Sequence, residues 1–188
     1  MTVAPKLRFT FREYLDLDEA SLVRLEFLEG MILGMAGGTP EHARLAVAIS
    51  ASLTRQLEGK RCAVYSEALR TRGSAGFAAY PDVTVVCGTL ERDPESKVSV
   101  TNPAVVVEVL SPGTAAYDSG EKLEQYKKIA SVQHVVLVAH DAPRVVVVSR
   151  TEGSNWAQTT SGPSEQAILP AIGCTLDVSA IFHDPLGG

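Results

Sequence analysis

Residues 104–112 of this chain read AVVVEVLSP, and residues 80–86 read YPDVTVV. Both stretches are rich in β-branched residues and predict buried strands. Each stretch contains one acid, Asp82 or Glu108, at a position where an ionised side chain loses its hydration. Two buried acids on adjacent strands need a partner, which is usually a divalent cation, an arginine or a proton that they share.

The length of 188 residues, with 45% hydrophobic and 21% charged residues, is typical of a globular chain. Such a chain can bury a substantial core without disulfides or metals, so we expect one domain over residues 1–188. Its apolar runs are far shorter than the roughly 20 residues that span a bilayer, and its N-terminus lacks the apolar segment of a signal peptide. We therefore expect a cytoplasmic protein with no membrane partner.

The three cysteines, Cys62, Cys87 and Cys174, are widely separated, and no two of them form a C-x-x-C pair. An odd number with this spacing supports neither a disulfide framework nor a structural zinc site. We therefore expect buried free thiols.

The formal net charge is −5, which disfavours a protein that coats nucleic acid nonspecifically. Residues 44–72 depart from this average, because six basic residues and two acidic ones give them a local balance of +4. This segment is either an anion-facing patch or a solvated helix and strand. Clustered surface charge usually only increases solubility, so the second interpretation is preferred.

The first part of the chain predicts a short helix, a hairpin and a long amphipathic helix. Residues 10–13 have the spacing of a capping box. Residues 23–35 alternate about a Glu-Gly turn and predict a hairpin, in which Arg24 and Glu26 point the same way and are placed to pair with each other. A Thr-Pro-Glu sequence then opens a helix whose apolar residues recur at helical spacing over residues 40–58.

The later segments predict a sheet with one crossover helix. We expect strands over 62–72, 82–87, 104–110, 134–140 and 144–149, a polar loop over 88–102, a helix over 118–130, a polar arm around Trp156 and a short helix over 176–182. The first two of these strands are expected to be antiparallel. The strand with Glu108, the helix after it and the strand at 134 form a β-α-β unit, which favours parallel pairing.

Asp82 and Glu108 are expected on neighbouring strands near the ends of the sheet. Mg²⁺ takes oxygen ligands from one or two carboxylates, together with waters and a substrate phosphate, and the backbone carbonyl of Val109 is a natural third ligand. Lys122 lies in the first turn of the following helix. There it can orient an attacking water or stabilise the charge that develops on a phosphate.

Structural interpretations of the same residues stay open at this point. Asp82 also fits a turn carboxylate that caps local backbone N–H groups. Glu108 also fits a buried salt bridge to Arg70 or Lys122, and Lys122 also fits a solvated helix residue.

Several short motifs together resemble the Uma-type family of restriction endonucleases. They are PDV at 81–83, VEVLSPGT at 107–114, Asp118, Glu121-Lys122 and Tyr126, and upstream Phe11-x-x-Tyr14, Glu26-x-x-Glu29-Gly30 and Pro40-Glu41-His42. The resemblance covers residues 9–150 and is specific as a set, although each motif alone is weak. The family belongs to the PD-(D/E)xK nuclease superfamily, whose core is a mixed sheet flanked by helices and whose members hydrolyse phosphodiesters with Mg²⁺.

The resemblance implies that Asp82 and Glu108 bind Mg²⁺, for which Mn²⁺ can substitute, in an endonuclease that acts on DNA. The superfamily places a lysine two residues after the second acid, but this chain has Leu110 there. Either Lys122 replaces that lysine or catalytic power is lost.

Two neighbouring residues at the start of the helix over 40–58 are further candidates for catalysis. His42 lies at the N-terminal end of the inward face, where it either caps local backbone or faces the site. The superfamily often carries a further acid on its first core helix, and Glu41, or His42 in its stead, occupies that place. Glu67, on the strand before Asp82, is a weaker candidate.

We therefore expect an α/β (α+β) fold with a restriction-endonuclease-like core, in which helices flank a mixed central sheet and an N-terminal hairpin and C-terminal strands are added. The expected function is Mg²⁺-dependent hydrolysis of DNA phosphodiester bonds by a homodimer, whose two-fold symmetry gives two cuts. One alternative is a catalytically inactive nuclease-fold module that binds nucleic acid or protein. Another, ranked last, is a metal-free hydrolase with a carboxylate pair, which leaves Lys122 unexplained and has only 6% aromatic residues to stack sugars.

Overall fold

The computed structural model describes residues 8–35, 38–153 and 155–187. The N-terminal part contains α1 (Phe11–Ala20), β1 (Leu25–Leu28), β2 (Met31–Gly34), α2 (Pro40–Gln56), β3 (Cys62–Ser66), β4 (Arg70–Arg72), β5 (Phe77–Ala79), β6 (Val83–Cys87) and β7 (Ser99–Val100). The C-terminal part contains β8 (Val105–Leu110), α3 (Ala115–Tyr117), the π-helical turn η1 (Asp118–Lys122), α4 (Leu123–Lys128), β9 (His134–Ala139), β10 (Val145–Arg150), β11 (Trp156–Ser161), β12 (Gln166–Leu169), the 3₁₀ turn η2 (Pro170–Ile172), β13 (Cys174–Asp177) and α5 (Val178–Phe182).

The described strands form three sheets. The largest has six strands in the order β11-β10-β9-β8-β6-β3, the second has five in the order β2-β1-β5-β4-β7, and β12 pairs with β13. Within the largest sheet β8 and β9 are parallel, whereas β6 is antiparallel to both β3 and β8. The structure thus confirms the mixed sheet, the parallel β-α-β unit and the added C-terminal strands.

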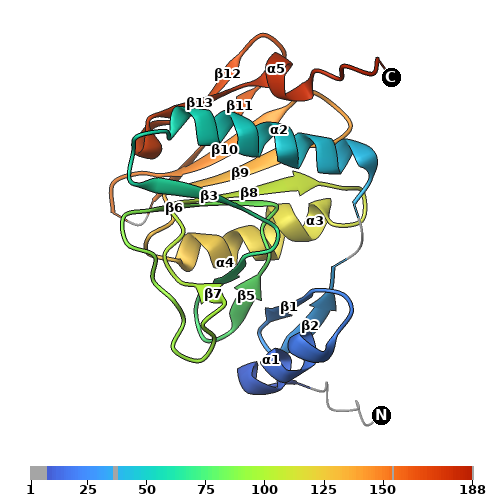
Figure 1. Ribbon diagram of the computed structural model, residues 1–188, viewed down its shortest axis with the longest axis vertical. Helices are drawn as coiled ribbons and strands as arrows, with labels where there is room; N and C mark the ends of the chain where they lie inside the picture. The colour runs from blue at the N-terminus through green and yellow to red at the C-terminus, as the bar shows by residue number, and fades with distance from the viewer. Residues whose placement is uncertain (1–7, 36–37, 154, 188) are drawn as a thin grey trace.

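Helices cover both faces of the six-stranded sheet, with α2 on one side and α4 on the other (Figure 1). Leu45 of α2 packs with Val107 of β8, whereas Tyr126 of α4 packs with Val106. Side chains alternate between the two faces along a strand, so Glu108 points to the same face as Val106. The Glu108 side chain therefore points toward α4.

The first two helices and the hairpin lie where the local sequence signals predicted them. Thr10 caps α1 in a capping box, and Thr39 caps α2 by accepting a hydrogen bond from the backbone N–H of His42 at 3.3 Å. The turn between β1 and β2 consists of Glu29 and Gly30, which have φ angles of 47° and 84°. This left-handed turn matches the twist of a hairpin and is accessible mainly to glycine and a few polar residues.

The prediction of three free thiols is wrong for two of the cysteines. Cys62 and Cys87 form a disulfide, and Cys174 is a buried free thiol. The reason is strand register, because Cys62 of β3 lies directly opposite Cys87 of β6. This proximity depends on the pairing of β3 with β6, so the spacing of the cysteines along the chain does not predict the disulfide.

The strand expected over residues 62–72 is divided between two sheets. β3 stays in the six-stranded sheet, but β4 pairs with β5 and, in parallel, with β7 from the segment expected to be a polar loop. Arg70 and Arg72 of β4 are buried and form ion pairs with Asp18 and Asp93. These long-range pairs hold β4 in the second sheet, and the hydrophobic pattern of the segment did not reveal them.

The basic residues of the segment 44–72 are largely used inside the molecule. Arg44 and Lys60 donate to backbone carbonyls near the C-terminus, and Arg70 and Arg72 form the two ion pairs just described. Such groups are not available to phosphates. These four residues therefore fit neither the anion-facing patch nor the solvated helix and strand, because groups of the fold itself bind them.

The helix expected over residues 118–130 begins three residues earlier, ends two residues earlier and is irregular. It comprises α3, η1 and α4, and Gly120 within η1 has non-helical angles of φ −110° and ψ −105°. Asp118, expected to open the helix, is buried and faces Lys122. None of the helices in the described residues is long and apolar enough to cross a bilayer.

Candidate active site

Asp82 directly precedes β6, and Glu108 lies within the neighbouring strand β8. β6 pairs with β8 so that Val83 is opposite Val107, and Asp82 directly precedes this pairing. The carboxylate of Asp82 accepts a hydrogen bond from the backbone N–H of Val109, the residue after Glu108, and its charge contributes to the raised pKa of Glu108. Both acids are buried, with relative exposures of 7% and 3%. The strand pairing thus brings the two predicted acids together.

The carboxylate of Asp82 contacts one residue of β8 and one residue of α2. Its Oδ2 accepts a hydrogen bond from the backbone N–H of Val109 at 2.7 Å and lies 3.2 Å from Nε2 of His42. The hydrogen bond to Asp82 raises the pKa of His42 above its ordinary value of 6.5, although partial burial opposes it. His42 thus faces Asp82, which agrees with the predicted alternative that His42 faces the site. It carries positive charge there more readily than a free histidine.

The carboxylate of Glu108 is held by two donors from the helical segment beneath the sheet. Its Oε1 accepts a hydrogen bond from the hydroxyl of Tyr126 at 2.6 Å and lies 2.9 Å from Nζ of Lys122. Burial raises the pKa of Glu108 well above its ordinary value of 4.5, and the charge of Lys122 only partly offsets this effect. Of the two salt-bridge partners considered for Glu108, the structure shows Lys122, since Arg70 pairs with Asp18.

Lys122 is surrounded by three carboxylates. Its Nζ lies 2.9 Å from both Glu108 and Glu26 and 3.4 Å from Asp118. Its side chain is only 4% exposed, so Lys122 is not a solvated helix residue. Burial lowers the pKa of Lys122, but the three carboxylates outweigh burial and raise it well above 10.5. An ammonium group has three hydrogens to donate, and each has a carboxylate within reach.

Glu26 is a member of this cluster that the sequence analysis missed. It was expected to pair with Arg24, but the Arg24 guanidinium lies over the Tyr80 ring, 5.0 Å from its centroid. Glu26 points inward to Lys122 instead. A signal was present, because an acid within the apolar run Leu25–Leu28 is as unusual as Glu108 within β8.

Two other candidates lie outside the buried cluster. Glu41 is exposed at the start of α2, where hydrogen bonding to Thr39 lowers the pKa of its carboxyl. Of the pair Glu41 and His42, the structure therefore brings only His42 to Asp82. Glu67 is exposed in the turn after β3 and lines a groove of about 1250 Å³ that follows the outer side of α2 and reaches His42 and Asp82. This groove gives solvent and ligands a route to His42 and Asp82, whereas Glu108 does not line it.

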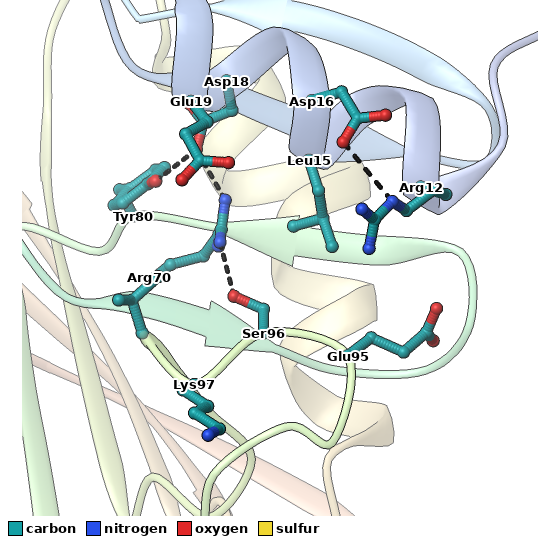
Figure 2. A pocket seen from close by; sticks show the side chains of 11 residues that line it. Arg12, Leu15, Asp16, Asp18, Glu19, Arg70, Tyr80, Glu95, Ser96 and Lys97 are labelled. Atoms are coloured by element: carbon teal, nitrogen blue, oxygen red, sulfur yellow. Dashed lines mark hydrogen bonds and ion pairs between the residues drawn. The ribbon is translucent and has the colours of Figure 1, made fainter.

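A second polar cluster braces the segment that leads into Asp82. Figure 2 shows the hydroxyl of Tyr80 and the guanidinium of Arg70 converging on Asp18. Arg70 lies 2.6 Å from Asp18 and donates to Ser96 at 2.6 Å. These groups line a pocket of about 390 Å³. Because the buried charges of this pocket are already paired, it is a structural brace rather than a reactive site.

The donors around the acid pair fit a hard divalent cation. No three His, Cys, Asp or Glu side chains in the described residues converge as a complete metal site, but Mg²⁺ commonly uses only one or two carboxylates. Asp82 and Glu108 supply these, and the carbonyl of Val109 lies on the same side of β8 as its N–H, which faces Asp82. Buried carboxylates outnumber the cations of the cluster by four to two: Asp82, Glu108, Glu26 and Asp118 against Lys122 and His42. An added cation, or a proton on Glu108, whose pKa burial raises, would offset this excess of negative charge.

Comparisons with known proteins agree with the fold. Residues 11–179 match the model of the Uma2 family, described as "Putative restriction endonuclease". Two uncharacterized proteins of Synechocystis sp., slr1290 and sll1609, are 29% and 28% identical over 182 and 162 residues, which cover 96% and 85% of this chain and 94% and 90% of theirs. A crystal structure titled as a "putative nuclease belonging to DUF820" from Anabaena variabilis matches with a TM-score of 0.76 and 18% identity, over 93% of this chain and 97% of that one.

Proposed function

The chain belongs to the Uma2 family, described as "Putative restriction endonuclease", and from this premise we propose that it is a Mg²⁺-dependent endonuclease that hydrolyses phosphodiester bonds of DNA. The family and the structural likeness support a nuclease in general, and the metal and the substrate are the finer part of the proposal. The observation that carries it is the hydrogen bond that Asp82 accepts from the N–H of Val109, next to Glu108, with Lys122 beside Glu108.

In this proposal Asp82, Glu108 and the carbonyl of Val109 hold the metal ion. When bound there, Mg²⁺ polarises a phosphoryl oxygen and lowers the pKa of a bound water. The chain itself orients these ligands, because the N–H of Val109 and the ring of His42 fix one oxygen of Asp82. The hydroxyl of Tyr126 fixes one oxygen of Glu108 in the same way.

Lys122 serves as a fixed positive charge in this proposal. Its pKa lies well above 10.5, so the ammonium group keeps its proton at neutral pH and cannot act as a general base. A preorganised cation in a water-poor site stabilises negative charge that develops on a phosphate. Lys122 would thus supply the charge that the superfamily pattern places at position 110, where this chain has Leu110.

One observation favours a second candidate function, a catalytically inactive nuclease-fold module that binds nucleic acid or protein. Glu26, Glu108 and Asp118 already surround Lys122, so its ammonium group has no unused direction for a phosphate. In an inactive module this buried cluster would only stabilise the fold.

A cleavage assay separates the two candidates. Purified protein is incubated with supercoiled plasmid, linear duplex DNA and RNA, with Mg²⁺, Mn²⁺ or EDTA. An active enzyme cuts DNA only with a metal, and Asp82→Asn and Glu108→Gln each abolish cutting. Glu67→Gln is the matched control, because it removes an exposed carboxylate that lines the same groove.

Calorimetry with Ca²⁺ completes this test, since metal binding does not require catalysis. Binding that is lost in Asp82→Asn and kept in Glu67→Gln supports the metal site. Absence of both cleavage and metal binding in the native chain refutes the proposed function and leaves the inactive module. Cleavage that persists in EDTA refutes the metal dependence. The expectation of a homodimer stays a prediction, which sedimentation of the protein with and without a duplex tests.

A further inference from the structure

We propose that Glu26 is the positioning residue of the candidate site, supplied by the N-terminal hairpin to hold Lys122 in place. This inference rests on the proposed function in that it assigns Glu26 a role toward the lysine of the same site. The placement of Glu26 is independent of that function and follows from the pairing of its strand and from two contacts of its carboxylate.

The backbone that carries Glu26 is firmly held. β1 lies inside the five-stranded sheet, paired with β2 on one side and with β5 on the other. Phe27 packs against Tyr14 at a centroid distance of 5.3 Å, which fixes the outer side of the strand. The Glu26 side chain points the other way and is only 5% exposed. A long side chain on such a strand is well placed to hold a second group in one position.

One oxygen of Glu26 connects two parts of the site. Its Oε1 lies 2.9 Å from Nζ of Lys122 and accepts a hydrogen bond from the backbone N–H of Tyr80 at 3.1 Å. Tyr80 stands two residues before Asp82, and its hydroxyl is bound by Asp18 (Figure 2). Glu26 therefore links the position of Lys122 to the segment that leads into Asp82.

Lys122 needs such a partner because the two other carboxylates do not fix it alone. Asp118 belongs to the same irregular turn, η1, so it does not tie Lys122 to another part of the fold. Glu108 is the acid that a bound metal would use. If Glu108 turns to a metal, Glu26 is the carboxylate from a separate element that still holds the ammonium group. Without Glu26, the lysine would remain on Glu108 and compete with the metal.

The variant Glu26→Gln tests this role with little change in shape. Glutamine keeps an oxygen for the N–H of Tyr80 but loses the charge that pairs with Lys122. Removing a group that orients a ligand typically costs 10- to 100-fold in metal affinity or activity. We expect kcat to fall about 10- to 100-fold with KM nearly unchanged, and Ca²⁺ affinity measured by calorimetry to fall about tenfold. Glu29→Gln, an exposed residue of the same hairpin, is the matched control and changes neither.

A double-variant comparison shows whether Glu26 acts through Lys122. In a Lys122→Met background, Glu26→Gln should change kcat and Ca²⁺ affinity less than twofold, because the group that it positions is absent. Equal effects in both backgrounds overturn the proposal, as does a Glu26→Gln protein with native kcat and native Ca²⁺ affinity.

Two further results keep the proposal falsifiable. If Glu26→Gln does not fold, Glu26→Asp keeps the charge on a shorter side chain and should give an intermediate kcat and Ca²⁺ affinity, whereas native values overturn the inference. If the native chain binds Ca²⁺ but cuts no nucleic acid, the proposed function fails while the calorimetric comparison still decides the role of Glu26. If it binds no Ca²⁺ either, both fail.

Discussion

Replacing Lys122 with methionine removes the ammonium group from the buried cluster and keeps a side chain of similar length. Three carboxylates within 3.4 Å then lose their cation. Breaking a buried ion pair by removing one partner costs about 3–5 kcal/mol of folding stability, because the other charge is left uncompensated. For a chain of this length we expect Tm to fall by roughly 6–20 °C at pH 7.5.

The pH dependence of the same variant gives the sharper result. The pKa of Glu108 is already raised above 4.5 by burial, and the charge of Lys122 opposes this rise. Without Lys122 the pKa rises further, so the folded state binds a proton that the unfolded state releases. Stability from this proton is present below about pH 4.5 and is lost as the pH rises through the higher folded pKa. The penalty of Lys122→Met is therefore smallest near pH 4.5 and largest at neutral pH.

Urea unfolding, followed by circular dichroism at pH 4.5, 6 and 7.5, measures both effects. Lys127→Met is the matched control, since Lys127 lies in α4, directly after η1, and pairs on the surface with Glu124, which is 64% exposed. Such a surface pair contributes about 0–1 kcal/mol. A loss below about 1 kcal/mol for Lys122→Met, or a loss that is equal at all three pH values, would show that the ammonium is not buried among carboxylates.

Three further predictions follow from other contacts of the structure. NMR titration should give His42 a pKa above 6.5, and Asp82→Asn should lower this pKa. The folding stability that the imidazolium contributes is present below pH 6.5 and is lost as the pH rises through the folded pKa. Tyr126→Phe should cost about 1–3 kcal/mol in urea unfolding because a buried carboxylate loses its donor, whereas Tyr117→Phe should cost almost nothing, since the buried Tyr117 hydroxyl has no hydrogen-bond partner among the described residues. Leu53→Ala should cost about 2–5 kcal/mol by the same measurement, because this fully buried side chain of α2 packs on the six-stranded sheet; a smaller loss would contradict that packing.

The amino-acid sequence alone determined the elements and the acids that lie within them. The capping residues, the hairpin turn and the runs of valine are local patterns, so they predicted α1, α2, the β1–β2 hairpin, the strand β6 that follows Asp82 and the strand β8 that carries Glu108. An acid in an apolar strand signals a requirement for a partner, because burial of an unpaired charge is too costly. That reasoning identified Asp82, Glu108 and Lys122, which the structure brings into one region.

The tertiary structure alone decided which partners these residues meet. Cys62 bonds to Cys87, Arg70 turns to Asp18, His42 rather than Glu41 faces Asp82, and Glu26 reaches Lys122. Each of these contacts joins elements that are distant along the chain, and each depends on strand register or on the way helices and sheets pack against one another. Hydrophobic period and capping act over a few residues and specify which face of an element is buried. They do not specify which of several buried charges will be neighbours, because that choice is made when all the elements pack together.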